Sequence, residues 1–323
     1  MDLNGKTILV TGGTGSFGKK FTEIVLSKYK PKKLIIFSRD ELKQLEMQRK
    51  YNSEAIRYFI GDVRDQSRLH RALQGVDVVV HAAALKQVPA CEYNPFEAVS
   101  TNIVGAENII NESIDHGVKK VIALSTDKAA NPVNLYGATK LCSDKLFIAG
   151  NSYSAGHETI FSVVRYGNVV GSRGSVVPVF LKQKETGKLT ITDKRMTRFW
   201  ITLEQGVEFV IRSLESMKGG ELFVPKIPSM NIMDLADAIA PGCDHKFLGI
   251  RPGEKLHEVM VPVDDAHRTL EFDDHFIIQP AFPWWDSAIW EHGKKVDDRF
   301  SYRSDNNDVW LTKNELEVMI KDI

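Results

Sequence analysis

The sequence predicts an α/β fold, in which a doubly wound parallel sheet is joined to a smaller C-terminal domain. In the first half of the chain, short apolar runs alternate with segments long enough for crossover helices. A glycine-rich loop directly follows the first apolar run. Beyond about residue 171 the alternation loosens and prolines punctuate the chain. We therefore expect residues 1–170 to form the sheet domain, and residues 171–323 mainly the second domain, partly interleaved with the first.

The predicted strands of the first domain are nearly continuous apolar runs, rich in valine and isoleucine. Such runs are typical of parallel strands that helices cover on both faces. The runs comprise residues 7–10, 33–37, 56–60, 76–80, 121–124 and 161–166. The alternation of these strands with helical patterns predicts a Rossmann-like sheet.

The second domain is predicted to mix short strands with helices. Strands are expected at residues 189–192 and 221–224, and helices near residues 203–216 and 231–240. Asn231, followed by Asp234, can cap the second of these helices. Thr312 and Glu315 have the spacing of a capping box, which indicates a final helix near the C-terminus.

The composition argues against several classes of protein. The chain holds 42 basic and 42 acidic residues, a balance that is unlike a nucleic-acid binder or a polybasic membrane-surface protein. The three cysteines are far apart and form no C-x-x-C pair, so they predict neither a disulfide scaffold nor a metal site. No apolar run reaches the roughly 18 residues that span a bilayer, and the first residues run straight into a strand. We expect no membrane segment and a cytoplasmic location.

The glycine-rich loop at residues 10–18 follows the first strand and opens a helix. Its glycines satisfy the dinucleotide-binding spacing G-x-G-x-x-G, and also a G-x-x-G-x-x-G variant. Glycines allow a tight turn and close backbone approach, while the helix N-terminus attracts a pyrophosphate. Glycine turns are common, so it is the strand–loop–helix context that makes the motif specific. The expected cofactor contacts in this loop are Gly12, Thr14, Gly15, Ser16, Phe17 and Gly18.

The end of the second predicted strand bears on the choice between NADP and NAD. It reads Ser38-Arg39-Asp40, where NAD sites usually carry an acidic residue for the ribose hydroxyl. Arg39 could pair with a 2′-phosphate, Ser38 could donate a hydrogen bond, and Lys43 lies one helical turn further on. This pattern favours NADP. In the alternative, Arg39 and Lys43 are solvated charges, and Asp40 holds NAD or only caps the helix.

Asp62 and Val63 directly follow the third predicted strand. Because the carboxyl ends of parallel strands meet at one edge of a sheet, these residues are placed to touch an adenine. The alternative is a turn aspartate that binds no ligand.

Two acid–base pairs lie close together in the sequence. Tyr136 and Lys140 are one turn apart on a predicted helix, so both side chains point the same way. Free tyrosine titrates near pH 10. A neighbouring ammonium and an oxidised nicotinamide would lower that pKa, letting the phenolate accept a hydroxyl proton. Asp127 and Lys128, just upstream, add a second pair, which indicates redox chemistry combined with elimination. Otherwise, both pairs are ordinary surface contacts.

Together, these motifs resemble the extended short-chain dehydrogenase/reductase family, and closer still the inverting UDP-N-acetylglucosamine 4,6-dehydratases, whose best-known members begin pseudaminic acid synthesis for flagellin glycosylation. The resemblance runs from residue 3 to the C-terminal tail. Gln87 is a departure, because many members have histidine there, and it puts one fine contact in doubt. The motifs that carry the resemblance are the glycine-rich loop, Asp62, His81-Ala82-Ala83-Ala84, Ser125-Thr126-Asp127-Lys128-Ala129, Tyr136 with Lys140, residues 165–175 and Arg251-Pro252-Gly253-Glu254-Lys255.

The resemblance implies a role for each acid–base group. Tyr136 takes the proton of the sugar 4-hydroxyl while NADP⁺ accepts a hydride from C4, and Lys128 removes the C5 proton. Asp127 protonates the departing C6 hydroxyl, and Thr126 belongs to the same catalytic set. For Lys128 to act as a base, we expect its pKa to be lowered by burial and by Lys140. Retaining relatives carry glutamate at position 128, so lysine there predicts inversion at C5.

The resemblance also implies binding residues and an assembly. It implies UDP-N-acetylglucosamine as substrate and a homo-oligomer, with a hexamer as the first expectation. A UDP-sugar 4-epimerase or reductase of the same fold, or a non-catalytic NADP-sensing regulator, are the alternatives. Further cofactor contacts are expected at Ala82, Ala84, Lys86, Tyr136, Lys140 and Val169, and substrate contacts at Lys86, Asn168, Arg173, Thr190, Arg251, Glu254 and Asn307.

Overall fold

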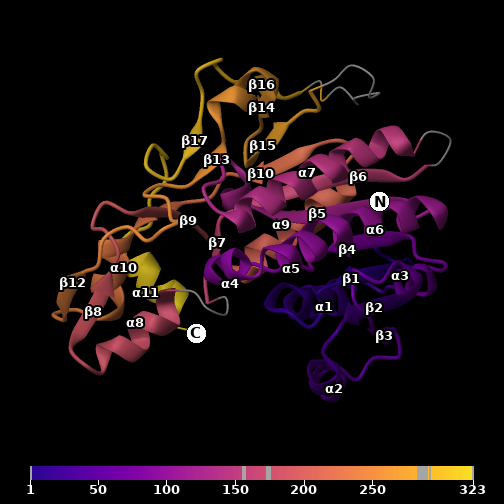
Figure 1. Cartoon of the computed structure of the whole chain (residues 1–323), viewed down its shortest axis with the longest axis horizontal. Coiled ribbons are helices and arrows are strands. Elements are labelled where there is room, and N and C mark those ends of the chain that lie inside the picture. Colours follow the sequence, from indigo (N-terminus) through magenta and orange to yellow (C-terminus); the bar gives the residue numbers. More distant parts are fainter. Residues whose placement is uncertain (1, 155–157, 172–175, 282–289, 291, 322–323) are drawn as a thin grey trace.

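A ten-stranded sheet runs through the molecule, in the order β16-β14-β15-β10-β6-β5-β4-β1-β2-β3 (Figure 1). This computed structural model describes residues 2–154, 158–171, 176–281, 290 and 292–321. Every pairing from β3 to β10 is parallel, whereas β15, β14 and β16 extend the sheet with antiparallel pairings. The parallel strands are β1 (Thr7–Thr11), β2 (Lys33–Ser38), β3 (Ile56–Ile60), β4 (Val78–His81), β5 (Lys120–Thr126), β6 (Ile160–Tyr166) and β10 (Leu222–Pro225). The antiparallel strands are β14 (Thr269–Glu271), β15 (His275–Ile278) and β16 (Lys294–Lys295).

The buried strands explain why this sheet forms. All residues of β1 and β4 are buried, as expected for apolar strands that are covered on both faces. The chain order reverses between β1 and β4, and at such a switch point the carboxyl ends of the strands leave a crevice for a ligand. The predicted α/β fold class is therefore confirmed, and each predicted strand is present with shifts of one or two residues at its ends.

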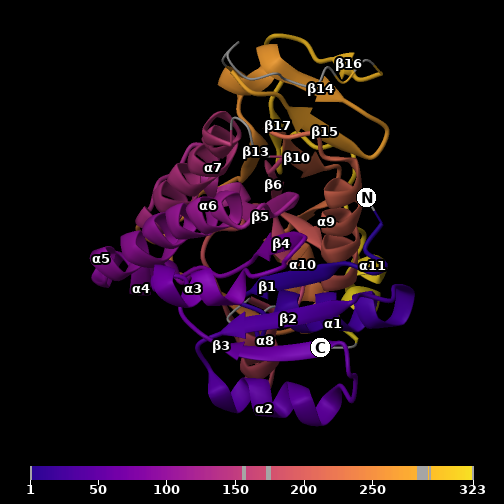
Figure 2. The same cartoon turned by 90° about the vertical axis from the view of Figure 1, so that its right-hand side faces the viewer.

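Helices cover both faces of the sheet (Figure 2). One face carries α1 (Ser16–Lys28) and α9 (Leu203–Ser216), which contact each other. The other carries α3 (Gln66–Ala72), α6 (Gly105–Asp115) and α7 (Leu135–Tyr153). Shorter elements flank these layers: α2 (Glu41–Lys50), α4 (Val88–Tyr93), α5 (Pro95–Val99) and the π-helical turn η1 (Ser100–Val104).

A smaller lobe with its own apolar core lies beside the carboxyl ends of the parallel strands (Figure 1). Its helices are α8 (Val176–Lys184), α10 (Ile232–Ile239) and α11 (Lys313–Ile320). Its small sheets comprise β7 (Asn168–Val169), β9 (Thr197–Ile201) and β11 (Ser229–Asn231), β8 (Lys188–Ile191) with β12 (Asp244–Phe247), and β13 (Val259–Val261) with β17 (Tyr302–Arg303). Asn231 caps α10, and Thr312 with Glu315 forms the predicted capping box of α11.

The chain passes repeatedly between this lobe and the main sheet. After β7 and α8 in the lobe, it returns as α9 and β10, and later as β14, β15 and β16. Between Pro262 and β14 it forms one further short helix, η3 (Val263–Arg268). Within the described residues, no helix is both long and apolar enough to cross a bilayer.

Candidate active site

A cavity of about 980 Å³ lies between the carboxyl ends of the parallel strands and the smaller lobe. This volume is at the upper end of the range for small-molecule sites. Two predicted site residues, Gly18 and Asn307, are described but do not line the cavity. A third, Arg173, lies outside the described residues. The predicted site residues that do line it are Gly12, Thr14, Gly15, Ser16, Phe17, Ser38, Arg39, Asp40, Lys43, Asp62, Val63, Ala82, Ala84, Lys86, Thr126, Asp127, Lys128, Tyr136, Lys140, Asn168, Val169, Thr190, Arg251 and Glu254.

The glycine-rich loop forms a narrow cradle at one end of the cavity. Gly12 has φ +63°, and a Cβ there would lie 2.9 Å from the backbone nitrogen of Ala83. Gly15 caps α1 without a side-chain hydrogen bond, and the first turn of this helix holds no acidic residue. The helix N-terminus is therefore suited to an anion such as a pyrophosphate. Gly18 acts differently, because a Cβ there would overlap the backbone of Gly13, so it lets α1 pack against the loop.

The second strand ends in an exposed cation and a capping aspartate. Asp40 Oδ1 accepts a hydrogen bond from the backbone nitrogen of Lys43 at 3.0 Å, and the two side chains form an ion pair. Asp40 therefore caps α2. The Arg39 guanidinium is 55% exposed and lies 3.5 Å from Asp62. It is accessible to an anionic group at this end of the cavity.

The acid–base groups lie where β5 meets α7. A 3₁₀ turn, η2 (Asp127–Ala129), follows β5, and Asn134 caps α7 by accepting a hydrogen bond from the nitrogen of Gly137. A Cβ on Gly137 would collide with the carbonyl of Lys128, so glycine allows α7 to pack against η2. This close packing brings Tyr136 and Lys128 to the same cavity.

Asp127 and Lys128 form a buried ion pair. Lys128 Nζ donates to Asp127 Oδ1 at 3.0 Å, and the Thr126 hydroxyl donates to the same oxygen at 3.0 Å. The Asp127 side chain is 1% exposed, and its Oδ2 has no hydrogen-bond partner in the described part of the chain. Burial raises the pKa of Asp127, although the Lys128 charge opposes this shift. Burial therefore favours the protonated form of Asp127, whereas the ammonium of Lys128 favours its carboxylate.

The second carboxylate on Lys128 is Glu258, which the sequence analysis missed. Glu258 is 2% exposed, and its oxygens lie 3.4 Å from Lys128, 3.7 Å from Arg198 and 3.8 Å from Lys255. Burial opposes ionisation, but these cations together lower the pKa of Glu258. Glu258 directly precedes the apolar strand β13, and the nearest acidic residue before it is Glu254, four residues earlier. The glutamate gave no signal in the sequence, because its cationic partners come mainly from other segments.

The expected lowering of the Lys128 pKa is wrong for the ligand-free protein. Burial does lower it, but Asp127 and Glu258 outweigh burial, so the pKa of Lys128 is raised. Lys140, which the sequence analysis named as the lowering charge, is itself buried, and burial lowers its own pKa. The two carboxylates therefore hold Lys128 as an ammonium before substrate binds.

The pKa of Tyr136 is raised in the ligand-free protein. Desolvation of the phenol raises the pKa of Tyr136 to about 12, against opposing effects of the Lys128 charge and the Thr126 hydroxyl. In this state burial outweighs the nearby positive charge, and the lowering of the pKa expected beside an oxidised nicotinamide stays a prediction.

The remaining predicted substrate contacts differ in their surroundings. Asn168 is exposed on β7, whereas Thr190 Oγ1 accepts a hydrogen bond from Gln183 at 2.7 Å. Arg251 is 60% exposed and lies 3.8 Å from Glu254, whose Oε2 is buried without a hydrogen-bond partner among the described residues. Arg251 therefore presents an exposed guanidinium to the cavity, which is suited to a diphosphate. Burial lowers the pKa of Lys86, another predicted contact that lines the cavity.

Asn307 has a structural role in this conformation. Its amide donates to the carbonyl of Ile227 at 2.8 Å and to the Ser229 hydroxyl at 3.0 Å. The C-terminal segment therefore packs against the start of β11 in the ligand-free protein, and the contact of Asn307 with a sugar stays a prediction.

Comparison with known proteins agrees with this geometry. Residues 8–280 match the model of a family described as polysaccharide biosynthesis protein. The inverting UDP-N-acetylglucosamine 4,6-dehydratase of Campylobacter jejuni strain 81-176 is 59% identical over 97% of each chain. A UDP-glucose 4-epimerase of Rickettsia conorii is 44% identical over 84% of this chain and 82% of its own. The solved structure of Pen from Bacillus thuringiensis has 39% identity and a TM-score of 0.91, covering 100% of this chain and 99% of that one.

The family match covers most of the chain, and the fold agrees with that of the solved structure of Pen. The chain therefore belongs to the polysaccharide biosynthesis protein family, and within it is similar to the inverting UDP-N-acetylglucosamine 4,6-dehydratases.

Proposed function

We propose that this chain is an NADP-dependent UDP-N-acetylglucosamine 4,6-dehydratase that inverts the configuration at C5. Its product would be UDP-2-acetamido-2,6-dideoxy-β-L-arabino-hex-4-ulose, the first intermediate of pseudaminic acid synthesis. The observation that carries the proposal is the Lys128–Asp127 pair, 3.0 Å apart, in the cavity that also contains Tyr136 and Lys140. The 59% identity to the Campylobacter jejuni dehydratase supports the choice of substrate.

The residues around the glycine-rich loop fit a nicotinamide dinucleotide. A Cβ on Gly12 would fill the cradle beside Ala83, and the N-terminus of α1 is open to an anion. Gly12 and Gly15 would hold the pyrophosphate. Ser38 and Arg39 would hold the 2′-phosphate of NADP. A bound nicotinamide would supply the hydride chemistry, with transfer from C4 and return to C6, so the overall reaction would be an elimination without net redox.

The proton transfers up to the loss of water are each assigned to one side chain. Tyr136 accepts the proton of the sugar 4-hydroxyl. Oxidation at C4 makes the C5 proton acidic, because the ketone stabilises negative charge on C5. Lys128 removes this proton, and Asp127 protonates the C6 hydroxyl as it leaves as water. The return of hydride to C6 is balanced by a proton delivered to C5 from the opposite face, which inverts C5 and admits deuterium from D₂O.

The Lys128–Asp127 pair can supply base and acid with one shared proton. Transfer of that proton across the 3.0 Å hydrogen bond leaves a neutral amine and a protonated carboxyl. Burial favours this transfer, because it raises the pKa of Asp127 and disfavours separated charges in a low dielectric. The raised pKa of Lys128 in the ligand-free protein is then compatible with its role as the base.

Two alternatives have different chemical signatures. The relative named UDP-glucose 4-epimerase, at 44% identity, favours 4-epimerisation as the second candidate. A 4-epimerase uses Tyr136 and Lys140 but has no need of an amine at position 128. A non-catalytic NADP-sensing regulator would need neither Tyr136 nor Lys140 in the cavity.

Incubation with UDP-N-acetylglucosamine and catalytic NADP, without added reductant, tests the proposal. Mass spectrometry in D₂O should show a sugar nucleotide that has lost one water and gained deuterium at C5. A product of unchanged mass with altered configuration at C4 would instead identify an epimerase.

Arg39→Ala is expected to weaken NADP binding roughly ten- to a hundredfold, because it removes a charge-assisted contact with the 2′-phosphate. NAD binding should change little. Calorimetric titration with both cofactors measures this, and Arg49→Ala, an exposed arginine further along α2, is the matched control. An equal loss of affinity for NAD and NADP would show that Arg39 does not contact the 2′-phosphate.

Glu258→Gln is expected to move the alkaline limb of the pH–rate profile to lower pH by about one unit. The negative charge of Glu258 helps to raise the pKa of Lys128, so its removal lets the shared proton leave at lower pH. The profile of water loss is measured for both proteins, with NADP affinity as the control. An unmoved alkaline limb would contradict a positioning role for Glu258.

A further inference from the structure

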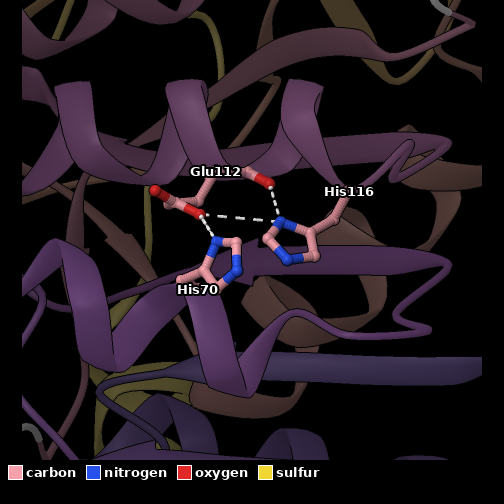
Figure 3. A group of neighbouring side chains, drawn as sticks. All are labelled: His70, Glu112 and His116. Carbon is pink, nitrogen blue, oxygen red and sulfur yellow. Dashed lines mark hydrogen bonds and ion pairs between the residues drawn. The ribbon is translucent and has the colours of Figure 1, made fainter.

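A cluster of metal-ligating side chains lies outside the cavity, between α3 and α6 (Figure 3). His70 comes from α3, Glu112 from α6, and His116 is the residue that ends α6. His70 Nδ1 lies 3.0 Å from Glu112 Oε2, and His116 Nδ1 lies 3.6 Å from the same oxygen. One ligand atom from each residue falls within 4.8 Å of the others. Three donors from two helices therefore converge on one point.

Glu112 is a buried carboxylate whose ion-pair partners are two histidines. Its side chain is 4% exposed, and Gln66 Nε2 donates to its Oε1 at 2.9 Å. Within the described residues, its ion pairs are with His70 and His116, which carry charge only when protonated. Buried carboxylates are normally paired with a cation or bound to a metal.

We propose that His70, Glu112 and His116 bind a divalent ion of the zinc class. Two imidazole nitrogens and one carboxylate oxygen are a donor set suited to Zn²⁺, Co²⁺ or Ni²⁺. Ligand bonds of about 2.1 Å in a tetrahedral site place neighbouring donor atoms about 3.4 Å apart, close to the 3.0 and 3.6 Å separations here. Gln66 orients the carboxylate by donating to its other oxygen, Oε1.

Access and proton balance are compatible with this site. The His70 side chain is 52% exposed, so it can adjust, and a water molecule can complete the tetrahedron from the solvent side. His116 Nδ1 lies 2.8 Å from the carbonyl of Glu112 and donates to it in the ligand-free protein. Coordination through this nitrogen requires that hydrogen bond to break and the neutral imidazole to carry its proton on Nε2 instead.

The ion would connect two helices that support the cavity edge. Asn108 of α6 donates to the carbonyls of Val63 and Arg64 at 3.0 and 3.2 Å, which holds the segment just before α3. That segment carries Asp62 and Val63, which line the cavity. A metal between α3 and α6 would therefore stabilise this corner of the fold without touching the acid–base groups.

The test uses the untagged full chain after treatment with a chelator. Calorimetric titration with Zn²⁺ should give one ion per chain, and saturating Zn²⁺ should raise the melting temperature by roughly 3 °C. His70→Ala and Glu112→Gln should lose both effects, whereas His267→Ala, an exposed histidine elsewhere, should retain them. Because His70 is half exposed, its variant is expected to fold even if substitution of the buried Glu112 disturbs the structure.

Two results would overturn the site: no rise in melting temperature with Zn²⁺, or binding that persists in His70→Ala. Neither depends on turnover of a nucleotide sugar, so the metal site and the proposed dehydratase activity succeed or fail separately.

Discussion

Lys128→Ala should abolish the loss of water from UDP-N-acetylglucosamine, with a fall in rate of at least about a thousandfold, while NADP still binds. General base catalysis typically contributes a factor of 10² to 10⁴, and the substitution also removes the hydrogen-bond donor to Asp127 with which we propose that the proton is shared. Its ammonium lies 3.0 Å from Asp127 and 3.4 Å from Glu258, so the change also leaves two buried carboxylates without their shared cation. Product formation is followed by mass spectrometry and NADP binding by calorimetry.

Lys128→Arg distinguishes the role of Lys128 as a base from its role as a positive charge. Arginine keeps a positive charge between the two carboxylates but does not lose its proton in proteins. This variant should retain the fold and NADP affinity yet remain inactive in water loss. Full turnover by Lys128→Ala would remove the basis for the proposed elimination.

Tyr136→Phe should reduce the rate of the whole reaction by at least about a thousandfold, because without a phenol the 4-hydroxyl proton has no acceptor. Phenylalanine preserves the ring that packs at the start of α7, so the fold and cofactor affinity should change little. This variant differs from Lys128→Ala in a single-turnover experiment. On mixing substrate with the NADP⁺ form, Lys128→Ala should still develop the absorbance of reduced nicotinamide, and Tyr136→Phe should not. The reverse pattern would contradict the assigned order of steps.

The parts of the fold that were predictable are those fixed by local sequence. Apolar runs with helical patterns between them determine the parallel strands, and the glycine-rich loop follows β1 as expected. Capping residues such as Asn231 and Thr312 act on their own helices, so their signals are also local. The short strands β14 and β16 were not predicted, because they form only by pairing along the edge of an existing sheet.

The parts that were not predictable depend on contacts between distant segments. Glu258 meets Lys128 across 130 residues of sequence, and this contact reverses the expected direction of the Lys128 pKa. Asn307 was predicted to meet the sugar, but its amide bonds to the backbone of Ile227. The sequence predicted no metal site because the cysteines are not paired. That argument does not apply to His70 and His116, which Glu112 brings together only in the folded chain.

The configuration of the product at C5, determined by NMR, tests the central claim most directly. Lysine at position 128, paired with Asp127 in the cavity, predicts an inverted centre, the L-arabino 4-keto sugar, with deuterium from solvent at C5. A 4-keto-6-deoxy product that retains the original C5 configuration, when observed early in the reaction, would contradict the account.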